Sequence, residues 1–273
     1  MDEKEKYIFI ICLKLLEFEI KELGVLSKKR STCYDLLRQK IDTLSSFVVS
    51  ESNRMLWEKW GGDPEVKKQT NNLREMIVQA ICDLEKYESK QIIDQDINTG
   101  SYFKSLSEQV EVETKTYDIN ENSYVLFIGA GALPISALAI ANKANAQMVC
   151  IDIDIDEEVI PLAERVTTSF RLDSLVSFSN LKASSLPTIH KVTHVIVASL
   201  VKDKDGVISD LYGVLKPESK IIVRYGNGLK SIFNYPLEKN NSLLWNWRKR
   251  ERKKQFYDTA LVKWFSTNNV GVN

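Results

Sequence analysis

Two glycines and a group of aspartates stand where successive strands are predicted to end. In VLFIGAGALPISALAIA, Gly129 and Gly131 follow an apolar run typical of a buried strand and precede a helical pattern. Glycines at such a turn let the backbone approach a ligand closely, because no Cβ stands in the way. The next predicted strand ends about 20 residues later in acidic residues, where a carboxylate can accept both hydroxyls of a ribose. Asp154 is the main candidate, flanked by Asp152 and Asp156; the alternative is that these aspartates only cap the next helix.

The residue at position 134 separates two kinds of nucleotide ligand. The dinucleotide fingerprint G-x-G-x-x-G has a third glycine at this place, whereas the chain has Pro134. This departure disfavours a pyrophosphate seated on the helix N-terminus. We therefore expect a nucleoside without phosphates, with S-adenosylmethionine as the candidate co-substrate.

Arg224 ends a further predicted strand, in the segment IIVRYGNG. From a strand end its side chain can reach the ligand crevice, where a guanidinium can bind a carboxylate through two parallel hydrogen bonds. A salt bridge at the strand end explains the residue equally well. Tyr225 and Asn227, in the same segment, and Tyr235, shortly after it, are further candidates for lining the pocket.

The elements that must position these residues fall into two groups. Residues 1–118 carry apolar side chains at three- and four-residue spacing, which predicts helices. From about residue 120, strand and helix patterns alternate, which predicts a mainly parallel sheet covered on both faces. We expect an α/β fold with a helical N-terminal domain, residues 1–118, and a Rossmann-like doubly wound domain, residues 119–273.

Composition argues against several functional classes. The 37 basic and 37 acidic residues balance, so no net charge attracts nucleic acid, and we interpret the run WRKRERKK as a solvated helix or strand connection. No apolar run reaches about 18 residues, so we expect no membrane span. The two histidines and four scattered cysteines lack metal-ligand spacing. We therefore expect a cytoplasmic protein with reduced cysteines that requires no metal.

Four segments, in order, resemble the nicotianamine synthase family. FIGAGALPISALAIA is similar to its FIGSGPLPLT-type strand, turn and helix, including Pro134. The stretch from VIVASLV to IFNYP resembles its "LAALVG … R-S-x-H-G … YP" region, AICDLEKYES its A-x-x-L-L-E-x-H-F-S helix, and SYFKSL its N-Y-L-x-L segment. The chain departs from the plant enzymes in a shorter loop between Glu85 and Tyr102, and in Asn227 where they have histidine.

This resemblance implies a reaction and two catalytic residues. Glu85 and Tyr102 match the family's catalytic glutamate and tyrosine; without the resemblance they would be an exposed helix residue and a packing residue. The implied reaction moves the 2-aminobutanoate arm of S-adenosylmethionine to an amino nitrogen and releases 5′-methylthioadenosine. Similarity to the bacterial staphylopine branch implies D-histidine as acceptor, in the biosynthesis of an opine metallophore.

Three alternatives remain at this stage. In the first, the acceptor is L-histidine or another amine. In the second, the chain is an ordinary methyltransferase, because the nucleoside site of such an enzyme has the same form. A non-catalytic nucleoside sensor is the third. A homodimer through the N-terminal helices is a further expectation.

Overall fold

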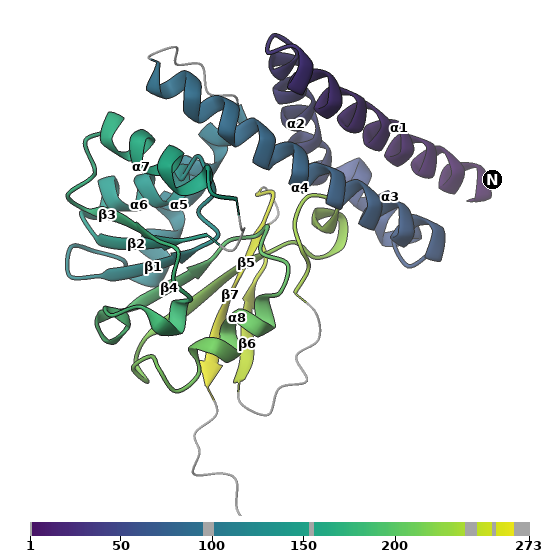
Figure 1. Ribbon diagram of the computed structural model, residues 1–273. Coiled ribbons are helices and arrows are strands. Elements are labelled where there is room, and N and C mark those ends of the chain that lie inside the picture. The colour runs from purple at the N-terminus through teal and green to yellow at the C-terminus, as the bar shows by residue number, and fades with distance from the viewer. Residues whose placement is uncertain (1, 95–100, 153–155, 238–244, 253–254, 265–273) are drawn as a thin grey trace, which may run out of the picture.

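The structure is a computed structural model that describes residues 2–94, 101–152, 156–237, 245–252 and 255–264, without the side chains of residues 2 and 101–107. In this part of the chain, four N-terminal helices lie together above one end of a twisted sheet (Figure 1). The long helix α4 crosses above the sheet with α1 on its far side, and α2 and α3 also contact the 3-10 turn that follows β5 (Lys220–Tyr225). These helices are α1 (Asp2–Lys29), α2 (Cys33–Val49), α3 (Glu51–Trp60) and α4 (Pro64–Ile93).

The sheet has seven described strands in the order β3-β2-β1-β4-β5-β7-β6. The first five in this order are parallel, and β7 runs antiparallel to both β5 and β6. The strands are β1 (Tyr124–Ile128), β2 (Gln147–Ile151), β3 (Val176–Ser179), β4 (His194–Val197), β5 (Lys220–Tyr225), β6 (Trp245–Arg250) and β7 (Asp258–Trp264).

Both faces of the sheet are covered, because neighbouring residues along each strand point to opposite sides. Val125 and Phe127 join one cluster together with α6 and α4, whereas Leu126 and Ile128 join a second cluster with Ile208 of α8. The covering elements are α5 (Ser101–Tyr117), α6 (Ile135–Ala144), α7 (Val159–Ser169), α8 (Lys204–Leu211) and short 3-10 turns at Ala183–Ser185, Ile189–Lys191 and Gly228–Ile232. This two-sided burial explains the continuous apolar runs of the central strands.

Helix α4 is tied to the sheet on both sides of its middle. Near its start, Arg74 Nη1 donates a hydrogen bond to the Ser231 carbonyl oxygen at 2.8 Å. Near its end, Ser89 Oγ donates to the Ala132 carbonyl oxygen, also at 2.8 Å. Both bonds are buried. They fix the middle of α4, which carries Glu85, over the ends of the strands.

The predicted fold class is confirmed: an α/β structure with a doubly wound, mostly parallel sheet. Strands β3, β6 and β7 were not predicted, because VSFS is short and the basic residues of β6 do not alternate with apolar ones as a half-buried strand does. The division after residue 118 stays a prediction. Helix α5, which lies before it, packs against α6 beside the sheet.

Candidate active site

A cavity of about 650 Å³ opens where the carboxyl ends of the central strands face helix α4. Ligands of open α/β sheets bind at this edge, and the volume suits a small-molecule ligand. The wall combines the β1–α6 turn, the segment after β4, the ends of β2 and β5, and one face of α4. Its residues include Val78, Cys82, Glu85, Phe127, Gly129, Gly131, Ser136, Asp152, Val201, Lys202, Asp203, Arg224 and Tyr235.

The Glu85 carboxylate packs directly against the glycine turn. A Cβ added to Gly131 would lie 2.2 Å from Glu85 Oε2, far inside van der Waals contact. Gly131 also has φ +71°, in the left-handed region that favours glycine. The sequence therefore has a glycine where the backbone of this turn meets the Glu85 carboxylate of α4.

Gly129 serves a different purpose in the same turn. Its φ is +81°, and a Cβ there would come within 2.7 Å of Val201 Cγ2 on the segment after β4. This glycine thus lets two strand-end loops pack together. Pro134 is buried and immediately precedes α6, where its carbonyl accepts the Leu138 N–H at 2.9 Å. Pro134 is therefore a helix-start residue behind the turn and is not part of the cavity wall.

The aspartates after β2 divide between the cavity and a surface contact. Asp152 lies in the cavity wall. Asp154, the main ribose-binding candidate, lies outside the described residues. Asp156 pairs with Lys86 of α4, and its carboxylate also accepts the Glu158 N–H at 3.1 Å near the start of α7. Asp156 thus forms a surface ion pair and a turn just before α7, whose N-cap residue, Glu158, makes no side-chain capping hydrogen bond.

Arg224 lines the cavity and is almost fully buried, at 2% exposure. Its Nε and Nη2 donate to Glu113 Oε2 of α5 at 3.1 and 2.6 Å, and its Nη1 donates to Ser136 Oγ at 2.8 Å. The guanidinium is thus held rigidly by an ion pair, as the salt-bridge explanation expects. It also ties α5 and α6 to β5 beneath the cavity.

Tyr225 and Asn227 are not among the residues of the cavity wall. Tyr225 points to the opposite sheet face from its neighbour Arg224 and is fully buried in the second core cluster, where burial raises the pKa of its phenol. Asn227 holds Leu237 instead: its Oδ1 accepts the Leu237 N–H at 3.0 Å. Tyr102 falls in the first turns of α5, where the side chains lie outside the described residues.

Tyr235, a further candidate for lining the pocket, lies in the cavity wall, within a polar group whose other members were not predicted. The Tyr235 hydroxyl donates to the Glu75 carboxylate of α4 at 3.0 Å, and burial together with this carboxylate raises the pKa of Tyr235 to about 12. Lys202 also pairs with Glu75, at 3.2 Å. Lys202 thus connects α4 to the segment after β4, Tyr235 connects α4 to the segment after the Gly228–Ile232 turn, and no spacing in the sequence links these residues.

Lys204, at the start of α8, supports the same segment from below. It is 3% exposed, and its Nζ donates to the Ser199 and Val201 carbonyl oxygens at 3.1 and 2.5 Å. Burial, helped by the positive charge of Arg74, lowers the pKa of Lys204 to about 7. The Lys204 amine thus donates the hydrogen bonds to this segment of the cavity wall that backbone N–H groups would otherwise donate.

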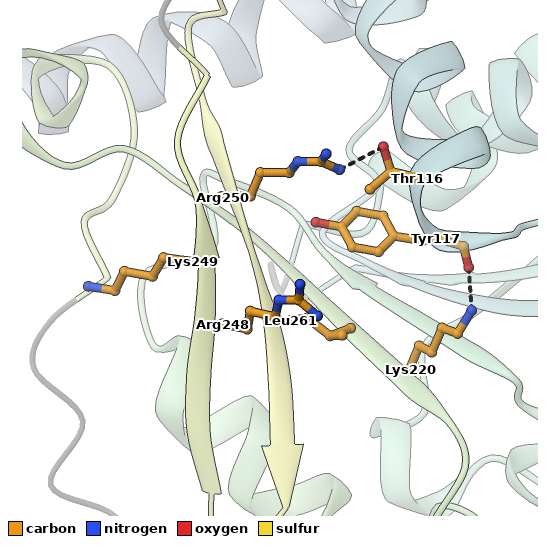
Figure 2. Close-up of a pocket in the computed structure, with 7 residues that line it drawn as sticks. All are labelled: Thr116, Tyr117, Lys220, Arg248, Lys249, Arg250 and Leu261. Carbon is orange, nitrogen blue, oxygen red and sulfur yellow. Dashed lines mark hydrogen bonds between the residues drawn. The ribbon is translucent and has the colours of Figure 1, made fainter.

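A second hollow of about 340 Å³ contains the basic run of the sequence (Figure 2). Arg250 of β6 donates to Thr116 Oγ1 at 3.0 Å, and Lys220 of β5 donates to the Tyr117 carbonyl oxygen at 2.8 Å. These cations neutralise the negative end of α5. Trp245 and Trp247 pack against the core on the other face of the strand from Arg248 and Arg250, and Lys249 also points away from these two arginines (Figure 2).

The described residues also bear on metal binding and on membrane insertion. Among them, no group of three or more histidine, cysteine, aspartate or glutamate side chains is arranged to hold a metal ion. No described helix combines the length and apolar character needed to cross a membrane.

Comparison with known proteins gives matches along nearly the whole chain. The family model described as nicotianamine synthase protein matches residues 16–248. An L-histidine 2-aminobutanoyltransferase from Pseudomonas aeruginosa (strain UCBPP-PA14) is 33% identical over 251 residues, which cover 92% of this chain and 95% of the relative. A protein of the same name from Yersinia pestis is 33% identical over 222 residues, covering 81% and 82% of the two chains.

Solved structures repeat the whole architecture. A crystal structure of MtNAS in complex with MTA and tNA has a TM-score of 0.73, with 90% of this chain and 97% of that chain covered at 15% identity. A variant of MtNAS in complex with S-adenosylmethionine gives 0.73, covering 91% and 97%, also at 15% identity. At this identity the likeness shows the fold, including the helical group above the sheet.

The buried amine of Lys204 predicts a pH-dependent stability. Between about pH 7 and the ordinary lysine pKa, the unfolded chain binds a proton that the folded chain lacks, so stability rises with pH. From about pH 7 to about pH 9 we expect a gain on the order of 1–3 kcal/mol in wild type relative to Lys204→Met. Urea denaturation of both proteins at several pH values measures this difference. An equal pH dependence in the two would contradict the lowered pKa and mean that the two carbonyls keep the amine charged.

Proposed function

The chain belongs to the nicotianamine synthase family, and from this membership we propose that it transfers the 2-aminobutanoate group of S-adenosylmethionine to the amino group of histidine. The observation that carries the proposal is the Glu85 carboxylate against the Gly131 turn, inside a cavity at the carboxyl edge of the sheet. A nucleoside site and a proton acceptor thus share one cavity. The co-product is 5′-methylthioadenosine.

The proposed reaction makes one bond and breaks one. The neutral acceptor nitrogen attacks the γ-carbon of the aminobutanoate arm, and the carbon–sulfur bond breaks with its electron pair left on sulfur. The cationic sulfonium becomes the neutral thioether of methylthioadenosine. The new ammonium loses a proton, for which Glu85 is the proposed acceptor, and Tyr102 is proposed to assist it. Such proton transfer contributes roughly 10²–10⁴-fold.

Position within the cavity decides which carbon reacts. A sulfonium activates its methyl group as well as its longer arm, so the reacting carbon is the one held about 3–3.5 Å from the nitrogen, in line with sulfur. In our proposal, the glycine turn and Asp152, with Asp154, hold the nucleoside. Arg224, fixed by Glu113 and Ser136, sets the wall beneath the arm. Because its charge is already paired with Glu113, we assign Arg224 a positioning role.

The acceptor has two candidates. The resemblance to the staphylopine branch implies D-histidine, which we retain as the proposed acceptor. The relatives named for L-histidine favour that enantiomer as the alternative. At 33% identity about two thirds of the aligned side chains differ, so the names of the relatives alone do not fix the enantiomer that this chain prefers. The product would be an intermediate of an opine metallophore.

We also place the enzyme in the cytoplasm. Its four cysteines are free thiols, as expected of a reducing compartment. Its proposed ligands are small molecules, and neither the transfer nor the proton step calls for a metal.

The products test the proposed reaction directly. With S-adenosylmethionine and D-histidine supplied together, mass spectrometry should detect methylthioadenosine and histidine carrying one aminobutanoate unit in equal amounts. Faster turnover of L-histidine would reassign the acceptor and leave the reaction in place. Formation of S-adenosylhomocysteine would contradict the proposal in favour of methylation, and binding without any turnover would favour a sensor.

Replacing the proposed proton acceptor should slow the reaction without changing the fold. Glu85→Gln keeps the size of the side chain but removes its basicity, so we expect kcat to fall roughly 10²–10⁴-fold. Glu65→Gln, on the exposed start of the same helix, is the matched control and should retain the wild-type rate. Steady-state assays of methylthioadenosine release measure both. A Glu85→Gln rate within twofold of wild type would exclude this role.

Two glycine-to-alanine variants separate the effect of backbone strain from the effect of displacing Glu85. Gly131→Ala and Gly213→Ala both place a side chain at positive φ (+71° and +79°), which costs roughly 1–2 kcal/mol in each. Only at Gly131 does the new Cβ meet Glu85, since nothing lies within 4 Å of Gly213. We expect similar losses of stability in urea denaturation, but a loss of kcat of at least about tenfold in Gly131→Ala alone. Equal activity in the two variants would show that the Glu85 position is unimportant.

A further inference from the structure

Helix α1 has two apolar faces, of which only one is covered. The inner face packs on the other N-terminal helices, and its residues are at most 9% exposed: Phe9, Ile10, Leu13, Leu16 and Ile20. The outer face carries a second row of large apolar side chains that are 44–62% exposed: Tyr7, Ile8, Ile11, Leu15, Phe18, Val25 and Leu26. In Figure 1, α1 lies on the outside of the helical group, on the side away from the sheet.

The outer row has the spacing of a helix-pairing seam. Ile8, Ile11, Leu15 and Phe18 follow one another at intervals of three and four residues, which places them on one stripe of the helix. Monomeric proteins rarely expose a continuous apolar patch of more than a few hundred Å². This row, defined by those four residues, is the outer stripe of α1.

We propose that the outer stripe pairs with the same stripe of a second copy of the chain, with the two α1 helices antiparallel. A two-fold axis near the middle of the stripe places Ile8 opposite Phe18 of the partner subunit, and Ile11 opposite Leu15 of the partner subunit. Every apolar residue of the stripe then meets an apolar residue, as a symmetric interface requires.

Charges at the ends of the stripe select the antiparallel arrangement. Lys4 and Glu22 continue the stripe in its two directions, and both are exposed. Within the described residues neither forms an ion pair. The proposed axis brings Lys4 opposite Glu22 of the partner subunit, at both ends of the interface. A parallel pair would instead bring Lys4 to the partner's Lys4 and Glu22 to the partner's Glu22, which repel.

The area of the outer stripe determines how tightly the two copies are expected to bind each other. From Lys4 to Glu22 the helix rises about 27 Å, and a strip about 10 Å wide along it covers roughly 270 Å² on each copy. A standard stable interface buries about 800 Å² per partner. The dimer is therefore expected to dissociate at micromolar concentrations, in an equilibrium that depends on protein concentration.

Sedimentation velocity of the full chain from about 1 to about 200 µM tests the proposal. Wild type should shift from monomer to dimer, and Leu15→Glu should stay monomeric throughout. Met55→Glu, at an apolar residue of α3 that is 62% exposed, is the matched control and should dimerise as wild type does. A wild type that is monomeric at every concentration would overturn the proposal, as would a Leu15→Glu variant that still dimerises with a wild-type circular dichroism spectrum.

A charge exchange tests the antiparallel register. Lys4→Glu should weaken the dimer by several-fold, and the double variant Lys4→Glu with Glu22→Lys should restore it. In a parallel dimer the double variant would stay as weak as the single one, which would overturn the proposed arrangement. A monomer that floats with phosphatidylglycerol vesicles through the same stripe would assign the stripe to a membrane surface and equally overturn the dimer.

Discussion

The close approach of the Glu85 carboxylate to the Gly131 backbone governs the arrangement of the rest of the site. The Glu85 carboxylate keeps this position because Gly131 has no Cβ, which would meet the carboxylate oxygens. The approach also requires α4 to lie at a fixed height above the sheet. The bonds from Arg74 to Ser231 and from Ser89 to Ala132 supply that constraint, one on each side of Glu85. The helical group thus forms one wall of the cavity, and the sheet carries the glycine turn.

A buried ion pair stabilises the opposite side of the same cavity. Arg224 and Glu113 are 2% and 0% exposed, and burying either charge alone would be costly. Ser136 accepts a further hydrogen bond from Arg224, so one guanidinium connects β5, α5 and α6. Lys204 has a comparable role under the segment after β4. These groups hold the cavity wall in place, and in our proposal the substrates enter a site that is already formed.

The strand-turn-helix at the glycine turn and the alternation of strands and helices could be predicted from the sequence. Both produce a local spacing of apolar residues that is visible along the chain. The opposite directions of Arg224 and Tyr225 could also have been predicted. Adjacent strand residues point to different faces of a sheet, so only one of the two can face the cavity. The partner of Arg224 could not be found this way. Glu113 is 111 residues away on a helix whose spacing gives no sign of the contact. The same holds for Tyr235 and Glu75, which are 160 residues apart.

The account rests on the γ-carbon of the bound sulfonium facing the acceptor nitrogen beside Glu85. A crystal structure of the chain with S-adenosylmethionine and imidazole lactate, which has a hydroxyl where histidine has its amine, tests this directly. The account predicts the γ-carbon within about 4 Å of that hydroxyl, in line with sulfur, with the Glu85 carboxylate in hydrogen-bond reach of the hydroxyl. A methyl group pointing at the hydroxyl, with the longer arm directed away from it, would contradict the account.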